Sequence, residues 1–209
     1  TPHAPIYING NNDFASQASS EGWAGDGTVD NPYIIENYDI NASTADGIYI
    51  QNTDVYFVVR NCTIHDGRSN YHEGIYLYNV QNAKIENCQI YNNSWGVVLV
   101  SSSNNISGCQ IYNNFVGICL YPFSNNNIII SNYVYNNSDY GIYLVDSSNN
   151  NITTNYIYNN SYAIYLDYAS NNNITANYVY NNSLYGVYLC ASSNNILSCL
   201  LYTSPSPRD

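Results

Sequence analysis

A repeat of about 22 residues runs through most of this chain. One clear copy, GIYLVDSSNNNITTNYIYNNSYA, extends from Gly141 to Ala163. The glycine that opens it recurs at positions 47, 74, 96, 117, 141 and 186, and Ala163 replaces it once. The spacing between successive markers is therefore nearly constant, and the longest interval lies between Gly47 and Gly74. A repeat of this length predicts a solenoid in which each copy packs only on its neighbours.

Each copy contains three short runs with a period of two, separated by Asn, Ser and Gly. In the Gly141 copy, Ile142 and Leu144 point to one side and Tyr143 to the other. This alternation is typical of β-strands, and no copy holds the longer helical pattern that a leucine-rich repeat requires. A left-handed helix of hexapeptides would have a shorter repeat, of about 18 residues. We therefore predict an all-β fold, a right-handed single-stranded parallel β-helix with about 22 residues per coil and about seven coils.

Alignment of the copies predicts which side chains stack in the interior. β-Branched residues suit such columns because they are stiff and pack well on pleated surfaces. The three predicted columns are Ile48, Ile75, Val97, Ile118, Ile142, Ile164 and Val187; Val59, Ile85, Ile106, Ile129, Ile152, Ile174 and Ile196; and Ile64, Ile90, Ile111, Val134, Ile157 and Val179. A fourth column changes along the chain: Cys62, Cys88, Cys109, Asn132, Asn155 and Asn177. Stacked amides can satisfy one another, so we predict an asparagine ladder that is replaced by cysteines in the first coils.

The repeat divides the chain into three segments. We expect residues 1–46 to form an N-terminal segment and cap whose first strand begins at Pro32, and residues 47–198 to form the β-helix. The last segment, residues 199–209, reads CLLYTSPSPRD and resembles the translation of a sequencing adapter, so we expect it to be foreign to the fold. The repeat stops in mid-coil and the chain has neither a starting Met nor a signal peptide, which predicts a fragment of a longer protein.

The copies resemble the parallel β-helix repeats of bacterial and archaeal surface proteins. The resemblance extends to the NosD-like periplasmic family, which is linked to copper-enzyme maturation, and to many proteins that bind or cleave carbohydrates. It covers about residues 21 to 198, and the segment from Gly22 to Ile40 also resembles the opening of archaeal NosD-like proteins. This resemblance implies the fold, but the fold hosts lyases, hydrolases, adhesins and spacers, so it does not select one function.

Composition narrows the possible partners. Fifteen acidic and four basic residues give a formal net charge of −11, which argues against nucleic acids and anionic membranes as partners. No apolar run is long enough for a membrane span, and we expect an extracellular, cell-surface or periplasmic protein. Nine glycosylation sequons occur, although a repeat rich in Asn, Ser and Thr also produces them by chance. They begin at Asn41, Asn61, Asn92, Asn105, Asn136, Asn151, Asn159, Asn173 and Asn181.

The cysteine column is the first candidate site. Three thiolates from Cys62, Cys88 and Cys109 could in principle bind copper(I) or zinc. The short C-x2-C spacings of metal sites are absent, and stacked interior thiols pack as small apolar groups. We therefore expect packing, and predict no metal or cofactor. Cys119 and Cys190 are expected at outward or strand-end positions without a partner.

A cluster of charged residues in the longest copy is the second candidate. It comprises Arg60, His65, Asp66, Arg68, His72 and Glu73, with Lys84 nearby. An inserted loop on a rigid scaffold is a frequent place for function. Such residues could perform acid–base chemistry or bind the carboxylate of a uronic acid; the alternative is a solvated loop with local ion pairs. Asn52-Thr53-Asp54 matches one short motif of polygalacturonase-like hydrolases, but their other motifs do not follow, so we do not assign catalytic residues.

Outward tyrosines are the third candidate, because the chain contains 25 of them and many align. One predicted stripe is Tyr91, Tyr112, Tyr135, Tyr158 and Tyr180, with Tyr133, Tyr156 and Tyr178 beside it; a second face carries Tyr49, Tyr76, Tyr143, Tyr165 and Tyr188. Aromatic rows flanked by amides and hydroxyls can bind sugar rings, or can simply stabilise the sheet.

These candidates define three functional hypotheses. The first is a secreted or cell-surface β-helix protein that binds glycans or surface polymers through its Tyr and Asn faces. The second is a polysaccharide lyase or hydrolase with its site in the loop of residues 60–73 or beyond the end of this sequence. The third is a NosD-like periplasmic factor for copper-enzyme assembly.

Overall fold

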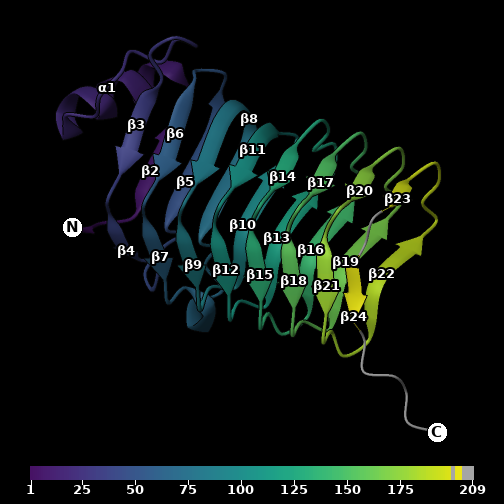
Figure 1. The fold of residues 1–209 in the computed structure, drawn as a ribbon. Helices are drawn as coiled ribbons and strands as arrows, with labels where there is room; N and C mark the ends of the chain where they lie inside the picture. The colour runs from purple at the N-terminus through teal and green to yellow at the C-terminus, as the bar shows by residue number, and fades with distance from the viewer. Residues whose placement is uncertain (199–200, 204–209) are drawn as a thin grey trace, which may run out of the picture.

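The computed structural model describes residues 1–198 and the backbone of residues 201–203. The chain forms an all-β parallel solenoid of about seven coils, which confirms the predicted fold class (Figure 1). Strands of one coil pair in parallel with the equivalent strands of the next, and we name the three lateral faces A, B and C. Of the predicted foreign tail, residues 199–209, only the backbone of one strand is described; the rest lies outside the described residues.

The chain passes through the faces in the order B, C, A. Face A is built from β1 (Pro2–His3), β4 (Asp39–Asn41), β7 (Thr63–His65), β9 (Gln89–Tyr91), β12 (Gln110–Tyr112), β15 (Tyr133–Tyr135), β18 (Tyr156–Tyr158), β21 (Tyr178–Tyr180) and β24 (Leu201–Thr203). Face B is built from β2 (Ile6–Asn9), β5 (Ile48–Thr53), β8 (Ile75–Glu86), β10 (Trp95–Val100), β13 (Val116–Tyr121), β16 (Tyr140–Val145), β19 (Tyr162–Asp167) and β22 (Tyr185–Cys190). Face C is built from β3 (Tyr33–Glu36), β6 (Phe57–Arg60), the second part of β8, β11 (Ser103–Ser107), β14 (Ile128–Ile130), β17 (Asn151–Thr153), β20 (Asn173–Thr175) and β23 (Ile196–Ser198).

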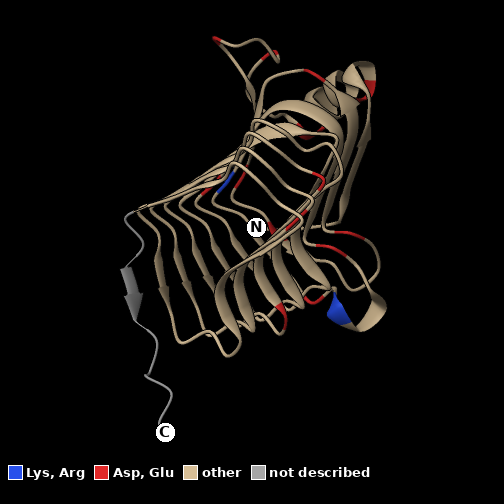
Figure 2. Cartoon of the chain, turned by 90° about the vertical axis from the view of Figure 1, so that its right-hand side faces the viewer, with Lys and Arg blue, Asp and Glu red and all other residues tan. Residues whose placement is uncertain are grey.

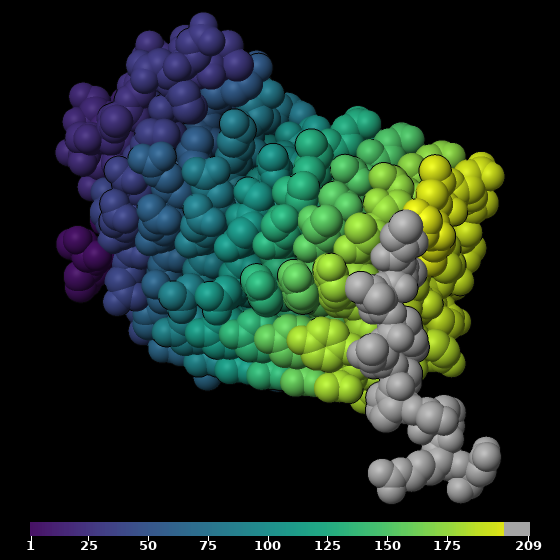
Figure 3. Space-filling model, in the orientation of Figure 1, coloured from purple at the N-terminus to yellow at the C-terminus, as the bar shows by residue number. Residues whose placement is uncertain are grey.

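The interior contains the predicted aliphatic columns, in register from coil to coil. On face B, for example, Ile118 pairs with Ile142 and Ile142 with Ile164, and all three side chains are fully buried. On the outside, equivalent side chains of successive coils line up in rows along the rod (Figure 3). One predicted position is wrong. Leu197, rather than Ile196, lies opposite Ile174, and the side chain of Ile196 is exposed.

The predicted ladder lies at the corner between faces C and A. The side chain of Asn132 donates a hydrogen bond to Oδ1 of Asn155, and that of Asn155 to Oδ1 of Asn177, each at 3.0 Å. In the first coils Cys62, Cys88 and Cys109 replace the asparagines and are buried in the same column, as predicted. Hydrogen bonding to the next thiol of the column is the largest cause that raises the pKa of Cys62 and Cys88, and burial adds to it.

Two further asparagine ladders were not predicted. At the corner between faces A and B the ladder is Asn93, Asn114, Asn137, Asn160 and Asn182. At the corner between faces B and C it is Asn104, Asn127, Asn150, Asn172 and Asn195. Each amide satisfies backbone groups that would otherwise be buried without partners where the strands end. The interior of the solenoid is therefore aliphatic along its faces and amide-bonded at its corners.

The marker glycine is required by close contact between coils. A Cβ atom on Gly117 would lie 2.5 Å from the carbonyl oxygen of Gly141 and 2.7 Å from Cγ1 of Val134. The corner residues before the marker are asparagines because the backbone there is left-handed, as at Asn136 (φ 55°) and Asn159 (φ 55°), and Asn tolerates this conformation better than most residues.

The first strand begins earlier than predicted. We expected it at Pro32, but β1 and β2 precede this position and pair with β4 and β5. Helix α1 (Asn11–Glu21) is inserted between β2 and β3, and its buried Phe14 stacks on Tyr33, with ring centroids 5.0 Å apart. Repeat alignment could not predict this helix, because the later copies contain no counterpart. Among the described residues, no helix has the length and apolar character needed to cross a membrane.

Candidate functional site

The outward tyrosines of face A form a continuous stack. Tyr91, Tyr112, Tyr135, Tyr158 and Tyr180 have neighbouring ring centroids 4.7 to 5.0 Å apart and ring planes within 15° of parallel. We call these five residues the tyrosine ladder. His65 extends it by one ring, stacked on Tyr91 at 5.4 Å. Since each ring face inside the ladder covers a neighbour, a sugar could contact only the hydroxyls and ring edges there.

The outer face of B carries aromatic rings in less regular packing. Tyr49 and Tyr76 meet edge to face, as do Tyr143 and Tyr165, whereas Tyr165 and Tyr188 stack at 5.0 Å. A second row, which was not predicted, lies beside the first. It runs along the starts of the strands and consists of Trp95, Tyr140, Tyr162 and Tyr185, and the buried Val116 lies opposite Trp95 on the strand between.

Cys119 occupies an outward position on face B, yet it is fully buried. It pairs with Val98 on one side and Tyr143 on the other. On the same face, the ring centroids of Trp95 and Tyr121 are 6.4 Å apart. Burial raises the pKa of the Cys119 thiol. The expectation of an outward position holds for its strand register, but the thiol is buried.

The loop of residues 66–74 connects β7 to β8 and protrudes at the corner between faces A and B (Figure 2). It contains a short 3-10 helix, η1 (Arg68–Asn70). The guanidinium of Arg68 extends along the corner, where it donates hydrogen bonds to the carbonyl of Asn113 at 3.3 Å and to Oγ of Ser138 at 2.8 Å. Arg68 therefore fixes the loop against the next coils.

The structure does not bring the other residues of the predicted charged cluster together with Arg68. Arg60 lies on face C and forms an ion pair with Glu36 at 2.8 Å. His65 lies on face A between Asp39 and Asp66, at 3.2 and 2.9 Å. Hydrogen bonds from His65 and Asn92 hold the pKa of Asp66 below its usual value.

His72 and Glu73 lie at the face B end of the loop, beside Asp46. Nδ1 of His72 is 3.7 Å from Oδ1 of Asp46, and the backbone N–H of Glu73 donates to the same oxygen at 2.8 Å. Burial raises the pKa of Glu73 to about 7; the nearby Asp46 carboxylate also raises it, and the hydrogen bond from the Trp95 N–H opposes this. A carboxyl group with a near-neutral pKa can exchange protons at neutral pH.

A hollow of about 530 Å³ lies between the loop and the start of face B. It is lined by Arg68, Ser69, Tyr71, Ser94, Trp95 and Phe115. We call it the loop hollow. Tyr71 is 85% exposed and Phe115 is 45% exposed, so both rings present open surface. Sequence reasoning missed Trp95 and Phe115, whose only signal is an aromatic residue one or two positions before a marker glycine.

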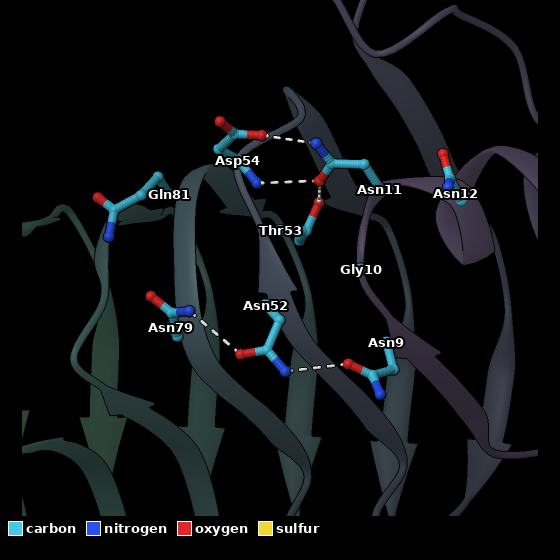
Figure 4. A pocket seen from close by; sticks show the side chains of 9 residues that line it. All are labelled: Asn9, Gly10, Asn11, Asn12, Asn52, Thr53, Asp54, Asn79 and Gln81. Atoms are coloured by element: carbon cyan, nitrogen blue, oxygen red, sulfur yellow. Dashed lines mark hydrogen bonds between the residues drawn. The ribbon is translucent and has the colours of Figure 1, made fainter.

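A second hollow, of about 590 Å³, lies beside the start of α1 and is lined mainly by amides (Figure 4). Its side chains bond to one another: Asn79 donates to Asn52 at 3.1 Å, and Asn52 to Asn9 at 2.9 Å. Asp54, from the Asn-Thr-Asp motif, accepts a hydrogen bond from Asn11 at 2.7 Å. The carboxylate of this motif is therefore engaged in joining the first two coils. Among the described residues, no group of three or more His, Cys, Asp or Glu side chains is placed to hold a metal ion.

Comparison with known proteins agrees with this geometry. The family model described as "Right handed beta helix region" matches residues 6–122 and 47–200. A search of curated protein sequences finds no match.

Solved structures show the same fold. A periplasmic alginate epimerase, AlgG (T265N T268M double mutant), superposes with a TM-score of 0.64 at 21% identity, over 80% of this chain and 50% of that one. Pectate lyase Pel9A gives a TM-score of 0.64 at 15% identity, over 93% and 70% of the two chains. The A-module of the Azotobacter vinelandii mannuronan C-5 epimerase AlgE4 gives 0.58 at 12% identity, over 81% and 62%. This chain thus spans half the length of the first of these structures.

Proposed function

The chain belongs to the right-handed β-helix family, and from that premise we propose that it binds a polysaccharide in the loop hollow and along the adjoining face B. The ligand that fits this site best is a glycan that carries carboxylates. The proposal rests on the lining of the hollow, which combines open aromatic rings, hydroxyls and one guanidinium.

The aromatic lining supplies the surface on which a sugar ring can pack. Tyr71 and Phe115 project into solvent without a stacking partner among the described residues. Their exposure contrasts with the tyrosine ladder, whose ring faces are occupied by neighbouring rings. Exposed aromatic groups rimmed by polar groups are typical of interaction surfaces.

Arg68 supplies the charge. Within residues 1–198, its guanidinium contacts a carbonyl and a hydroxyl but forms no ion pair. Its remaining N–H donors can bind a carboxylate with two parallel hydrogen bonds. In a chain with a net charge of −11, an arginine without an acidic partner is therefore the natural contact for an acidic sugar.

Face B extends the site along the rod. Tyr143, Tyr165 and Tyr188 lie farther along face B on successive coils, and Ser138 and Ser161 line a further hollow of about 460 Å³ at the same corner. Between positions 87 and 198 the only charged side chains are three aspartates, so this part of the surface offers aromatic rings, amides and hydroxyls. Such a surface fits the uncharged faces of a sugar polymer.

The similar solved structures support a polysaccharide as the ligand. They include proteins named as an alginate epimerase and a pectate lyase. Polysaccharides of this kind are met outside the cytoplasm, so we place the protein at an extracellular, cell-surface or periplasmic site, in agreement with its acidic composition.

The test measures binding to alginate, pectate and an uncharged xylan by calorimetry. Removing one well-packed aromatic anchor costs about 1.4 kcal/mol or more, so we expect Tyr71→Ala to bind about tenfold more weakly. Arg68→Gln should lose affinity for the two acidic polymers and keep its affinity for xylan. Tyr168→Ala, an exposed tyrosine on another corner, is the matched control and should bind as the unmodified protein does.

Two results would overturn the proposal. One is the absence of binding to any of the three polymers. The other is binding that survives both loop substitutions but is lost in Tyr158→Ala, which would move the site to the tyrosine ladder.

A polysaccharide lyase or hydrolase is the second candidate, and Glu73 favours it. Burial places the pKa of this carboxyl at about 7, beside Asp46 and next to Trp95 of the loop hollow. A group with such a pKa can act as a general acid or base. Release of new chain ends from a polyuronate, abolished in Glu73→Gln, would establish this activity. The NosD-like alternative has no comparable supporting feature in the described residues.

A further inference from the structure

Six tyrosines cover face A over three successive coils, in two columns side by side. The first column is Tyr133, Tyr156 and Tyr178, with centroid distances of 4.8 and 4.5 Å and ring planes within 6°. The second is Tyr135, Tyr158 and Tyr180 from the tyrosine ladder, at 4.9 and 4.7 Å and also within 6°. We call these six residues the tyrosine patch.

The register of the strands fixes how these rings overlap. β15, β18 and β21 pair in parallel, with Tyr133 opposite Tyr156 and Tyr156 opposite Tyr178. Identical side chains on paired parallel strands leave the sheet in the same direction. With nearly parallel planes and side chains that leave the sheet in the same direction, the carbons ortho to the hydroxyls of neighbouring rings are separated by about the centroid distance, 4.5 to 4.9 Å.

The outer side of the patch is open. Tyr133 is 44% exposed and Tyr178 is 36% exposed, so an oxidant reaches them and the rings have room to turn. Burial and, after it, the neighbouring phenols raise the pKa of Tyr156 and Tyr158. These phenols are consequently neutral at physiological pH, and removal of an electron is accompanied by loss of the phenolic proton.

We propose that the tyrosine patch is a site of oxidative cross-linking, in which adjacent tyrosines of successive coils join as dityrosine. The co-reactant is a one-electron oxidant of the peroxidase and hydrogen peroxide class. Each of two phenols loses one electron and one proton, and the two phenoxyl radicals form a carbon–carbon bond between their ortho carbons. The hydrogens on these carbons then move as protons to the two oxygens, which restores both rings. In total two hydrogen atoms are removed, and they convert one hydrogen peroxide to two waters.

The patch is the part of face A where a second stacked column runs beside the tyrosine ladder. Tyr49 and Tyr76 meet edge to face at 81°, so their ortho carbons do not overlap. Tyr71 and Tyr168 are more exposed but pair with no other tyrosine ring within the described part of the chain, so we expect them to react only with another molecule. Cross-links in the patch would join equivalent positions of neighbouring coils, from Tyr133 to Tyr156 and from Tyr156 to Tyr178.

The experiment treats the intact protein with a haem peroxidase and hydrogen peroxide at several protein concentrations. Dityrosine fluorescence, intact mass and mapping of linked peptides report the products. We expect chains of monomeric size that have lost two hydrogens per link, with links among β15, β18 and β21 and a yield independent of protein concentration.

The double variant Tyr156→Phe, Tyr158→Phe removes the central hydroxyl of each column while keeping the ring stack. It should lose the within-chain dityrosine links that map to β18, whereas Tyr71→Phe, Tyr168→Phe should keep them. The proposal is overturned if the double variant in the patch forms as much within-chain dityrosine as the unmodified protein. It is equally overturned if the products are mainly links between chains through Tyr71 or Tyr168.

Discussion

Replacement of Asn155 by alanine measures what one rung of the asparagine ladder contributes to stability. The side chain is fully buried, and its Nδ2 donates to the carbonyl of Ile129 at 2.9 Å and to Oδ1 of Asn177 at 3.0 Å. Its Oδ1 accepts from the backbone N–H and from the side-chain amide of Asn132, both at 3.0 Å. Nδ2 also donates to the carbonyl of Thr153 at 3.1 Å. Alanine removes all five hydrogen bonds and leaves the Asn132 N–H buried without this acceptor.

The magnitude follows from these contacts. Each buried polar group left without a partner costs about 1–3 kcal/mol. With the Asn132 N–H and the Ile129 carbonyl both deprived of the amide, we expect the free energy of unfolding to fall by about 2–5 kcal/mol.

Urea unfolding followed by circular dichroism is a suitable assay. The matched control is Asn151→Ala, because Asn151 is a half-buried asparagine on face C whose Oδ1 accepts one amide hydrogen bond, from Asn173 at 3.0 Å. This control should cost less than about 1 kcal/mol. Equal losses in the two variants would refute the reasoning, because the buried amide would then contribute no more than a surface one.

A third variant separates the loss of hydrogen bonds from the loss of volume. Asn155→Cys reproduces the residue found at Cys109, whose thiol is 3.7 Å from the carbonyl of Ile85 and donates to it. We expect its stability to lie between that of the native protein and that of Asn155→Ala.

Three further predictions concern other positions. Burial raises the pKa of Glu73 from 4.5 to about 7, so the folded state binds a proton that the unfolded state releases. The stability that this proton contributes is lost as the pH rises from about 4.5 to 7. The melting temperature should therefore fall with pH across this range, and it should fall less in Glu73→Gln. Gly117→Ala should destabilise the fold by about 1–3 kcal/mol through overpacking against the next coil, whereas Ala163→Gly should cost less than about 1 kcal/mol. The urea midpoints of the two variants give the comparison. Equal costs would contradict the close contact between Gly117 and the next coil. The thiols of Cys88 and Cys119 are buried, so a thiol reagent should modify them only after unfolding, as counted by mass spectrometry of digested protein. Fast reaction in the native state would show that the structure around these thiols opens.

The fold could be predicted because the same period-two pattern recurs in every copy. A shift of one residue in the strand register would turn Ile142 and Leu144 outward and Tyr143 inward. The same holds for the equivalent triplet of each copy, so a single register buries the aliphatic side chains along the whole chain. The misplaced Ile196 shows the limit of this reasoning. The last copy has one asparagine fewer than its predecessor, and alignment on isoleucine instead of on the asparagine ladder shifted that coil by one position.

The candidate site could be predicted only in part. The stacking of Tyr135 on Tyr158 follows from identical residues at identical strand positions. The loop hollow does not, because it assembles Tyr71, Trp95 and Phe115 from three different coils, and these residues depart from the repeat. Their positions depend on how the inserted loop folds back on the corner. A comparison of the copies cannot predict this, because the other copies have no such loop.

The asparagine ladders give the rod two unlike ends. In every rung the N–H groups belong to the earlier coil and the accepting oxygen to the later one, as in Asn114 to Asn137 and Asn127 to Asn150. The amide dipoles therefore add along the axis, as they do in an α-helix, and each hydrogen bond polarises the next. The partial positive charge points toward the later coils, so the molecule has an electrical direction as well as a chain direction. Any stacking of two such rods that continued the ladders would have to be head to tail.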